Sequence, residues 1–460
     1  MIQFEEFLEL NKNKKIVGVQ GLGFVGAIMA LVLTNCTDEN YAVIGVDINE
    51  DIVASLNNGK LHISSSDPKV EAYFKNAIVK KNLFVTSDSR YFSECDIIIV
   101  DINLDVKKHN DFKINNTNGY DIIIEPFKKG MELIGMNCKK DVLIIIETTV
   151  PPGTCEKIAY PIILESLKER GVKTNLLKLG HSYERVMPGP NYIDSIENFP
   201  RAYSGINIAS KTATAKFLST IINVDKFPLQ PLENTTSSET AKVLENSYRA
   251  MNIAFIDEWS KFAEVSGVDL FEVIDTIRIR PTHKNIMYPG FGVGGYCLTK
   301  DPLLASWSSQ KIFNSEKLKQ SESSVAINDK MPFHIIKKIK VLDILTPSIL
   351  VLGISYLKDV GDMRYAPFLS IENELKKISS KLMTYDPFIK KAEYDTDNWE
   401  DIINTKFDII IIGSPHTIFI KNKNLEEISL LNKYAVFIDP FNIACHLKIN
   451  NNIITIGNGN

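Results

Sequence analysis

The sequence has 460 residues, 44% of them apolar and 23% charged, which predicts a folded protein of about three domains. Its 52 basic and 56 acidic residues give a net charge of −4 without a basic cluster, which disfavours nucleic acid or a membrane surface as a partner. No apolar run approaches the roughly 18 residues that a membrane helix needs, and the acidic start is unlike a secretory signal. The six cysteines are scattered without a Cys-x-x-Cys pair, so we expect no metal site and a cytoplasmic location.

Short apolar strands alternate with helical segments through the first part of the chain. Strands are predicted at 15–19, 41–46, 96–100 and 142–146, with a helix over 27–33. Runs that are apolar throughout, rather than alternating, are typical of parallel strands buried on both faces. The pattern predicts a doubly wound α/β domain over residues 1–205.

A long amphipathic helix is predicted over 234–266. Thr236-x-x-Glu239 has the pattern of a capping box at its start. At about 1.5 Å per residue, a helix of this length extends over roughly 40–45 Å, more than one domain needs. We expect it to join two domains within a helical segment, 206–330, and its apolar face to serve a homodimer. That face consists of Leu244, Tyr248, Met251, Phe255, Trp259 and Phe262, spaced by three or four residues.

Buried strands return in the last segment, 331–460, at 348–353, 408–412 and 435–438. This segment repeats the architecture of the first but not its sequence. Only Gly353 stands at the turn equivalent to the first glycine motif, so we expect no second NAD site, although the crevice could hold another nucleotide. The predicted fold class is α/β, with two Rossmann-like doubly wound parallel-sheet domains joined by a long central helix and a helical middle domain.

A glycine motif, Gly-Leu-Gly-Phe-Val-Gly at 21–26, lies between the first predicted strand and the first helix. Asp47 ends the next strand, 21 residues past Gly26, and this context is typical of a dinucleotide site rather than of a glycine turn without a ligand. Asp47 would bind both ribose hydroxyls and repel a 2′-phosphate, which favours NAD over NADP. The glycines allow the pyrophosphate to reach the helix N-terminus. We expect NAD to contact Gly21, Gly23, Phe24, Val25, Gly26 and Asp47.

A second glycine-rich segment, residues 290–295, has four glycines in six residues and leads into Cys297 and Asp301. Such a backbone can wrap closely around a ligand. A cysteine beside a cation and an acid can be a thiolate nucleophile, although a lone cysteine is more often a buried filler, as we expect for the other five. Together with an NAD site, this loop suggests a dehydrogenase that oxidises an aldehyde as well as an alcohol. An aldehyde must first gain a nucleophile before its carbon can lose a hydride, and addition of a thiolate provides that nucleophile.

With these motifs the chain resembles the UDP-glucose/GDP-mannose dehydrogenase family, the NAD-dependent nucleotide-sugar 6-dehydrogenases, from about residue 15 to 445. The motifs occur in the family order, at 21–26, 148–154, 183–189, 238–246, 292–301 and 356–364. The resemblance implies a four-electron oxidation of the sugar C6 alcohol to a carboxylate. It also implies consumption of two NAD, and a role in making precursors of surface polysaccharides.

The resemblance also assigns roles by motif position. Cys297 would attack the C6 aldehyde, and a second hydride transfer would leave a thioester. Lys242 and Asn246, one helical turn apart, would stabilise the developing C6 oxyanion; without the resemblance we would regard them as solvated surface residues. Candidates for proton transfer and for activation of the hydrolytic water are Asp301, Glu184 and Thr149.

Further binding contacts are implied in the same way. Arg364 and Thr149 would lie near the cofactor. Arg280 matches, across a gap, a family arginine that crosses the dimer to the substrate. Considered without the resemblance, Glu184, Lys358 and Arg364 could be ordinary surface residues. The substrate contacts that we expect are Glu184, Lys242, Asn246, Arg280, Phe291, Gly292 and Lys358.

The sequence leaves the sugar open. UDP-glucose enzymes commonly carry a second glutamate at the position of Pro188, and Glu-Arg-Val-Met-Pro-Gly at 184–189 resembles the branch acting on UDP-N-acetylhexosamines. The loop at 295–301 resembles the UDP-glucose branch instead, and GDP-mannose is a further alternative. The family's usual Val-Pro-Thr-Pro after the fourth strand is replaced by Val-Asp-Ile-Asn at 100–103, which puts the loop contacts there in doubt.

Two other functions compete with this reading. A two-electron hydroxyacid-type dehydrogenase would share the first glycine motif but would need neither the cysteine loop nor a second α/β domain. A non-catalytic NAD sensor would keep that motif without needing Lys242, Asn246, Cys297 and Asp301 together.

Overall fold

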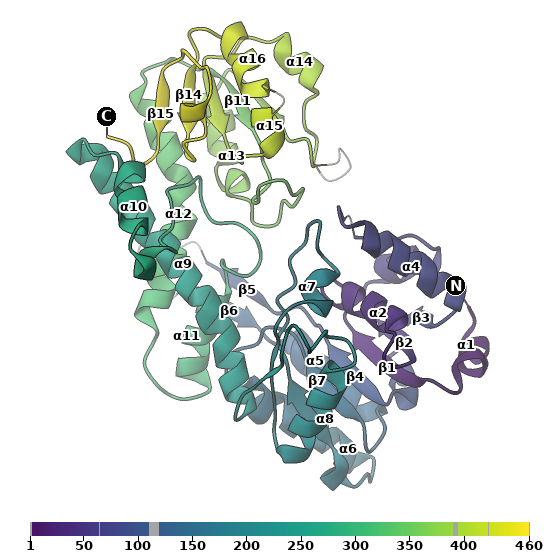
Figure 1. The fold of residues 1–460 in the computed structure, drawn as a ribbon. Helices are drawn as coiled ribbons and strands as arrows, with labels where there is room; N and C mark the ends of the chain where they lie inside the picture. Colours follow the sequence, from purple (N-terminus) through teal and green to yellow (C-terminus); the bar gives the residue numbers. More distant parts are fainter. Residues whose placement is uncertain (1, 64, 110–118, 390–393, 422, 460) are drawn as a thin grey trace. The chain divides into compact units, whose positions relative to one another are not determined.

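The structure, a computed structural model, describes residues 2–63, 65–109, 119–389, 394–421 and 423–459 (Figure 1). The chain forms two compact units. The first comprises Met1–Lys107, Asp121–Leu244 and Trp307–Lys317, and the second comprises Lys108–Tyr120, Glu245–Ser306 and Leu318–Asn460. The three-domain boundaries near residues 205 and 330 stay a prediction.

The first unit is built on an eight-stranded sheet in the order β10-β9-β8-β7-β4-β1-β2-β3. All neighbouring strands are parallel except β8 and β9, which are antiparallel. The carboxyl ends of the central strands therefore meet at one edge, where ligands bind in such sheets. The strands are β1 (Lys15–Gln20), β2 (Tyr41–Val46), β3 (Leu83–Thr86), β4 (Ile97–Val100), β7 (Leu143–Ile146), β8 (Lys178–His181), β9 (Ala202–Gly205) and β10 (Gln230–Pro231).

Helices cover this sheet on both faces, which explains why β4 and β7 are buried along their whole length. The helix after the first glycine motif, α2, is buried almost throughout, because it packs on the sheet and against α4. The helices are α1 (Phe4–Asn11), α2 (Gly26–Asn35), α3 (Glu50–Asn57), α4 (Pro68–Lys80), α5 (Glu125–Asn137), α6 (Tyr160–Glu169), α7 (Asp194–Glu197) and α8 (Ile208–Leu218).

The second unit contains a five-stranded parallel sheet in the order β12-β11-β13-β14-β15. Its strands are β11 (Ser348–Leu352), β12 (Lys381–Tyr385), β13 (Ile409–Ile412), β14 (Val436–Asp439) and β15 (Ile453–Thr455). Two α/β sheets, the first parallel except for the β8–β9 pair and the second parallel throughout, thus confirm the predicted fold class. The helices that follow α9 (Thr235–Ser266) are α10 (Leu270–Arg278), α11 (Asp301–Lys311), α12 (Lys319–Val341), α13 (Pro367–Ile378), α14 (Trp399–Ile403), α15 (Thr417–Lys421) and α16 (Asn424–Leu431). A separate two-stranded sheet pairs β5 (Asp105–Lys108) with β6 (Tyr120–Ile123).

The predicted long helix is confirmed as α9 (Thr235–Ser266), with 32 residues. The predicted capping box is wrong. The side chain of Asn234 accepts the Ser237 N–H at 2.8 Å and caps the helix, while the Glu239 carboxylate accepts the N–H groups of Gly153 and Cys155 at 2.5 and 2.7 Å. A tertiary contact therefore replaces the local one. No helix in the described part of the chain is long and apolar enough to cross a membrane.

The predicted apolar face of α9 is largely exposed. The buried apolar residues of the helix are instead Val243, Ala250, Ala254, Ile256 and Ala263. The rings of Phe255 and Phe262 lie 6.0 and 5.6 Å from the Trp259 ring. The exposed fractions across this face are 63% for Leu244, 48% for Tyr248, 50% for Phe255, 46% for Trp259 and 57% for Phe262.

Candidate active site

The first glycine motif forms the tight turn that a dinucleotide requires. Gly21 has φ of +92°, and a Cβ on Gly26 would lie 1.9 Å from the Gly21 carbonyl oxygen, so both positions require glycine. A Cβ on Gly23 would meet nothing within 4 Å, which leaves its backbone open to a ligand. The motif ends where α2 begins, and the first N–H groups of that helix are suited to a pyrophosphate.

Asp47 lies directly after β2, beside this turn. Its carboxylate accepts the Leu22 N–H at 2.6 Å and the Asn49 N–H at 2.8 Å, which fixes its position. His62, which we did not single out from the sequence, lies close to both Leu22 and Asp47. Burial lowers the pKa of His62, so this imidazole supplies no cation for a 2′-phosphate at neutral pH. The residues at this turn therefore fit NAD.

The remaining predicted cofactor contacts in the motif are Phe24 and Val25. The Phe24 side chain is 40% exposed and Val25 is half-buried. The hydroxyl of the buried Tyr192, 168 residues further along the chain, donates to the Phe24 carbonyl at 2.7 Å and anchors the motif. Sequence reasoning missed Tyr192 because no local pattern links the two positions.

The structure brings Glu184 and Lys242 together within the first unit. The Lys242 ammonium donates to the Glu184 carbonyl at 2.7 Å and lies 3.6 Å from its carboxylate oxygen. Both side chains are nearly buried, with exposed fractions of 9% for Lys242 and 12% for Glu184. The Glu184 carboxylate also accepts the N–H of Val186. Neither residue is therefore the solvated surface residue that its sequence position alone suggests.

Thr149 lies half-buried in the loop after β7, at the carboxyl edge of the sheet. Glu239 of α9 holds the end of this loop through the two amide contacts described above. Burial raises the pKa of Glu239 to about 7, although these amides favour its charged form. Sequence reasoning missed this loop-holding role, because the capping-box pattern offered Glu239 a local partner.

In the second unit, Cys297 lies exposed in a turn that leads into α11. The glycines before it allow close packing within the protein. A Cβ on Gly294 would lie 2.3 Å from the Tyr356 Cβ, and one on Gly295 would lie 2.7 Å from the Tyr356 ring. The Gly295 N–H also donates to the Arg364 carbonyl at 2.9 Å. The loop therefore rests on the segment after β11, which holds the thiol in place.

Asp301 is fully buried at the start of α11 and has two donors. The Asn246 amide donates to one carboxylate oxygen at 2.6 Å, and the Lys300 ammonium lies 2.8 Å from the other. Lys300 also lies 4.6 Å from the centre of the Tyr296 ring. The backbone N–H of Asp301 donates to the Cys297 carbonyl at 2.9 Å. The structure thus brings Asn246, Asp301 and the cysteine turn together, and it adds Lys300, which we had not selected.

The other predicted contacts in the second unit are more varied. Arg364 forms a two-pronged ion pair with Asp362, with contacts of 2.6 to 3.1 Å. Lys358 and Arg280 are exposed. The Phe291 side chain is buried in the core with Phe368, so only its backbone is open to a substrate. A Cβ on Gly292 would lie 2.8 Å from Pro332, so close packing against Pro332 requires glycine at this position.

The other five cysteines are unlike Cys297. Cys95, Cys138 and Cys155 are buried, and burial raises the pKa of each thiol. Cys36 is half-buried, and Cys445 is exposed with a raised pKa. All six lie in the described part of the chain as free thiols. The described residues contain no group of three or more His, Cys, Asp or Glu side chains that could hold a metal ion.

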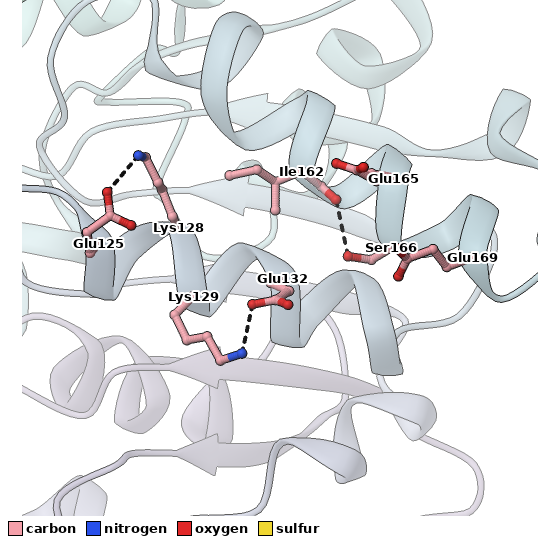
Figure 2. A pocket seen from close by; sticks show the side chains of 8 residues that line it. All are labelled: Glu125, Lys128, Lys129, Glu132, Ile162, Glu165, Ser166 and Glu169. Carbon is pink, nitrogen blue, oxygen red and sulfur yellow. Dashed lines mark hydrogen bonds and ion pairs between the residues drawn. The ribbon is translucent and has the colours of Figure 1, made fainter.

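Figure 2 shows a polar groove between α5 and α6, apart from these residues. Two of its four acids are paired within their own helix, since Lys128 lies 2.7 Å from Glu125 and Lys129 lies 2.8 Å from Glu132. None of the candidate residues lines it. Its charges are those of a solvated surface, and we assign it no function.

The chain is similar to known proteins along most of its length. Three models of the UDP-glucose/GDP-mannose dehydrogenase family match: the NAD binding domain at 15–219, the central domain at 236–330 and the UDP binding domain at 350–446. A UDP-N-acetyl-D-mannosamine dehydrogenase of Methanococcus vannielii is 31% identical and covers 98% of this chain and 99% of its own. The structure of a UDP-D-ManNAc dehydrogenase from Pyrococcus horikoshii superposes with a TM-score of 0.81 at 25% identity, covering 96% of this chain and 99% of its own. An NDP-N-acetyl-D-galactosaminuronic acid dehydrogenase from Methanosarcina mazei shares the fold, with a TM-score of 0.75, 23% identity and 98% coverage of both chains.

Proposed function

Because the chain belongs to the UDP-glucose/GDP-mannose dehydrogenase family, we propose that its substrate is UDP-N-acetyl-D-mannosamine, oxidised at C6 to the carboxylate. Family membership confirms the predicted NAD cofactor and the predicted class, an NAD-dependent UDP-sugar dehydrogenase. The choice of sugar rests on the Methanococcus vannielii relative, which matches along nearly the full length of both chains. The Glu-Arg-Val-Met-Pro-Gly segment at 184–189 supports the same branch.

We assign the second oxidation to covalent chemistry at Cys297. NAD, when bound, accepts the hydride that leaves C6 in each oxidation. The Cys297 thiolate adds to the aldehyde carbon, and the resulting thiohemiacetal loses a hydride to become a thioester. Water then breaks the carbon–sulfur bond, which releases the carboxylate and returns the thiol. Exposure of Cys297, in contrast to the buried cysteines, supports this role.

We assign the polar groups around the two oxidations as follows. The Lys242 ammonium and the Asn246 amide stabilise negative charge on the C6 oxygen. Glu184 and Asp301 transfer protons, and Thr149 helps to orient the hydrolytic water. The Glu184–Lys242 and Asn246–Asp301 contacts support these assignments, because each pair holds a charged group and its partner in one position.

Substrate and cofactor contacts complete the proposal. Arg364, held by Asp362, lies near the cofactor in this scheme. Lys358 and Arg280 bind the nucleotide sugar through exposed side chains. Gly292 and the backbone of Phe291 bind it through the loop. Gly21, Gly23, Gly26 and Asp47 hold NAD.

We further propose a homodimer formed through the exposed face of α9. Tyr248, Phe255, Trp259 and Phe262 are each about half exposed, and an aromatic patch of this kind is typical of an interface. The proposed setting is the cytoplasm, where NAD is available and free thiols persist, and the product would serve surface polysaccharide synthesis.

The test of the sugar is one panel of substrates. Purified protein and NAD are mixed separately with UDP-ManNAc, UDP-GlcNAc, UDP-glucose and GDP-mannose, and NADH absorbance is followed. We expect kcat/KM to be highest for UDP-ManNAc. A higher value for any of the other three would overturn the choice of sugar while leaving the family assignment intact. Turnover of a simple hydroxyacid and of none of the four would overturn the proposed reaction.

A further inference from the structure

Strand register brings four charged residues of the first unit to one edge of its sheet. Val100 of β4 pairs with Ile146 of β7, so Asp101 and Glu147 follow neighbouring strands at their carboxyl ends. Glu184 follows β8, the next strand in the sheet. Arg201 precedes β9, which runs antiparallel to β8, so its start lies at the same edge. Asp101 belongs to the segment that departs from the family pattern.

These residues form a charged cluster in which Glu147 and Arg201 are buried, while Asp101 and Glu184 are partly buried. Arg201 donates through Nη1 to Glu147 Oε1, and their exposed fractions are only 4% and 2%. The Asp101 and Glu147 carboxyls are hydrogen-bonded to each other. Asp101 Oδ2 and Glu147 Oε2 are nevertheless buried without an N–H or O–H donor from any described residue. Two adjacent carboxyls can satisfy each other in this setting only if one of them carries a proton.

The charges around the pair identify the protonated member. Glu147 has Arg201 as a counter-ion, whereas Asp101 forms no ion pair with any residue that the structure describes. The charged and titratable groups that act on Asp101 are Glu147, Glu184 and Arg201. Burial, followed by the negative charges of Glu147 and Glu184, raises the pKa of Asp101 well above its usual range, with Arg201 opposing this. Asp101 is therefore the donor of the shared proton.

Asp101 also supports the first glycine motif. Its carbonyl oxygen lies 2.6 Å from where a Cβ on Gly21 would be, and its own Cβ lies 3.1 Å from where one on Gly26 would be. Its N–H donates to the Gln20 carbonyl at 2.8 Å. A movement of Asp101 would therefore displace the turn that holds the pyrophosphate.

We propose that Asp101 is a positioning residue for NAD, held beneath the glycine motif by a proton that it shares with Glu147. This inference goes beyond the proposed function, because it concerns the cofactor and does not depend on the sugar. Loss of the proton leaves two adjacent carboxylates, of which only Glu147 is paired with Arg201. Their repulsion moves Asp101 away from Glu147 and disturbs its contacts with Gly21 and Gly26.

The test compares NAD affinity across pH in wild type, Asp101→Asn and Asp96→Asn. Asparagine keeps the shape of Asp101 and donates an N–H to Glu147 at every pH. Asp96 lies at the opposite, amino end of β4, where its carboxylate is exposed and pairs with Lys139. The Kd for NAD is measured by calorimetry from about pH 6 to about pH 9.5, a range in which a carboxyl group with a strongly raised pKa loses its proton.

We expect the wild type and Asp96→Asn to lose NAD affinity several-fold as pH rises, and Asp101→Asn to hold a constant Kd. Infrared spectra near pH 7.5 should also show a protonated carboxyl band in wild type that Asp101→Asn lacks. An Asp101→Asn protein with the wild-type pH dependence would overturn the proposal. So would a folded Asp101→Asn protein that binds NAD weakly at every pH. Glu147→Gln gives a second check, because an ionised Asp101 would then no longer be repelled by an adjacent carboxylate at position 147, and the pH dependence should be strongly reduced.

Discussion

At the scale of single residues, Cys297 differs from the buried cysteines in its exposure, and from the exposed Cys445 in its place in the turn before α11. We predict that Cys297→Ser lowers steady-state kcat by orders of magnitude. A serine hydroxyl is a poor nucleophile near neutral pH, and the ester that it would form is less reactive toward water than a thioester. The variant should still bind NAD and substrate, and intact-protein mass spectrometry should detect an aldehyde-level or covalent species. Cys445→Ser, which removes the other exposed thiol, is the matched control, and near-wild-type turnover of Cys297→Ser would reduce Cys297 to a packing role.

We propose that one residue, Asp47, also decides the choice of cofactor. Its carboxylate is held beside the glycine motif by the N–H groups of Leu22 and Asn49, where we expect the 2′ position of the ribose. We predict that NAD is strongly preferred and that Asp47→Ser narrows the ratio of kcat/KM for NAD over NADP, because the repelling carboxylate is gone. Asp51→Ser, which changes an exposed acid in the first turn of α3, should leave the ratio unchanged. Equal wild-type kcat/KM for both cofactors would show that Asp47 does not distinguish the ribose 2′-hydroxyl of NAD from the 2′-phosphate of NADP.

At the scale of elements, the N-terminal part of α9 is tied to the 153–155 loop by Glu239. Its pKa in the folded protein, about 7, is raised above the ordinary value of 4.5, so folding favours the protonated form. The stability that this proton contributes is complete below about pH 4.5 and is lost as pH rises to about 7, at roughly 1.4 kcal/mol per pKa unit. We predict that Glu239→Gln flattens the fall of apparent Tm over this range. Glu258→Gln, on the exposed side of α9, should keep the wild-type slope, and a wild-type slope in Glu239→Gln would contradict the assignment.

The exposed aromatic face of α9 leads to a prediction about assembly. Trp259→Glu places a charge at the centre of this face, between Phe255 and Phe262. Burying that unpaired charge in an interface is costly, so we expect the variant to be a monomer in light scattering after size exclusion. Val341→Glu, at an 82% exposed apolar residue of α12, is the matched control and should remain dimeric. A dimeric Trp259→Glu protein would place the interface elsewhere.

At the scale of the whole molecule, the reaction should run from alcohol to acid without release of an aldehyde. We predict two NADH for each sugar oxidised, because in the proposed mechanism a thioester step follows the first hydride transfer and ends in hydrolysis. The measurement is total NADH absorbance with limiting UDP-sugar and excess NAD, with the product identified by mass spectrometry. One NADH per sugar and a stable aldehyde would instead support a two-electron dehydrogenase.

The predictable parts of this protein are those with a local signal. The central strands, the long helix and the glycine motif were all predicted, because periodicity and glycine requirements act between neighbours in the chain. The outer strands β8, β9 and β10 were not predicted, since they are short and their pairing partners determine them. The resemblance to the family identified the candidate site residues through motifs that occur in the family order, but the roles of these residues remain predictions.

Tertiary structure decided which partner each polar group has. Glu239 binds the loop at Gly153 instead of capping its own helix, because its side chain is buried against that loop. Asp101 meets Glu147 only because β4 and β7 pair in the register that joins Val100 to Ile146. The sequence by itself determined the family, the cofactor and the α/β architecture, because these depend on motifs and periodicity within short segments. Contacts between segments that lie far apart in the chain depend on strand order and register. Only the tertiary structure decided these contacts.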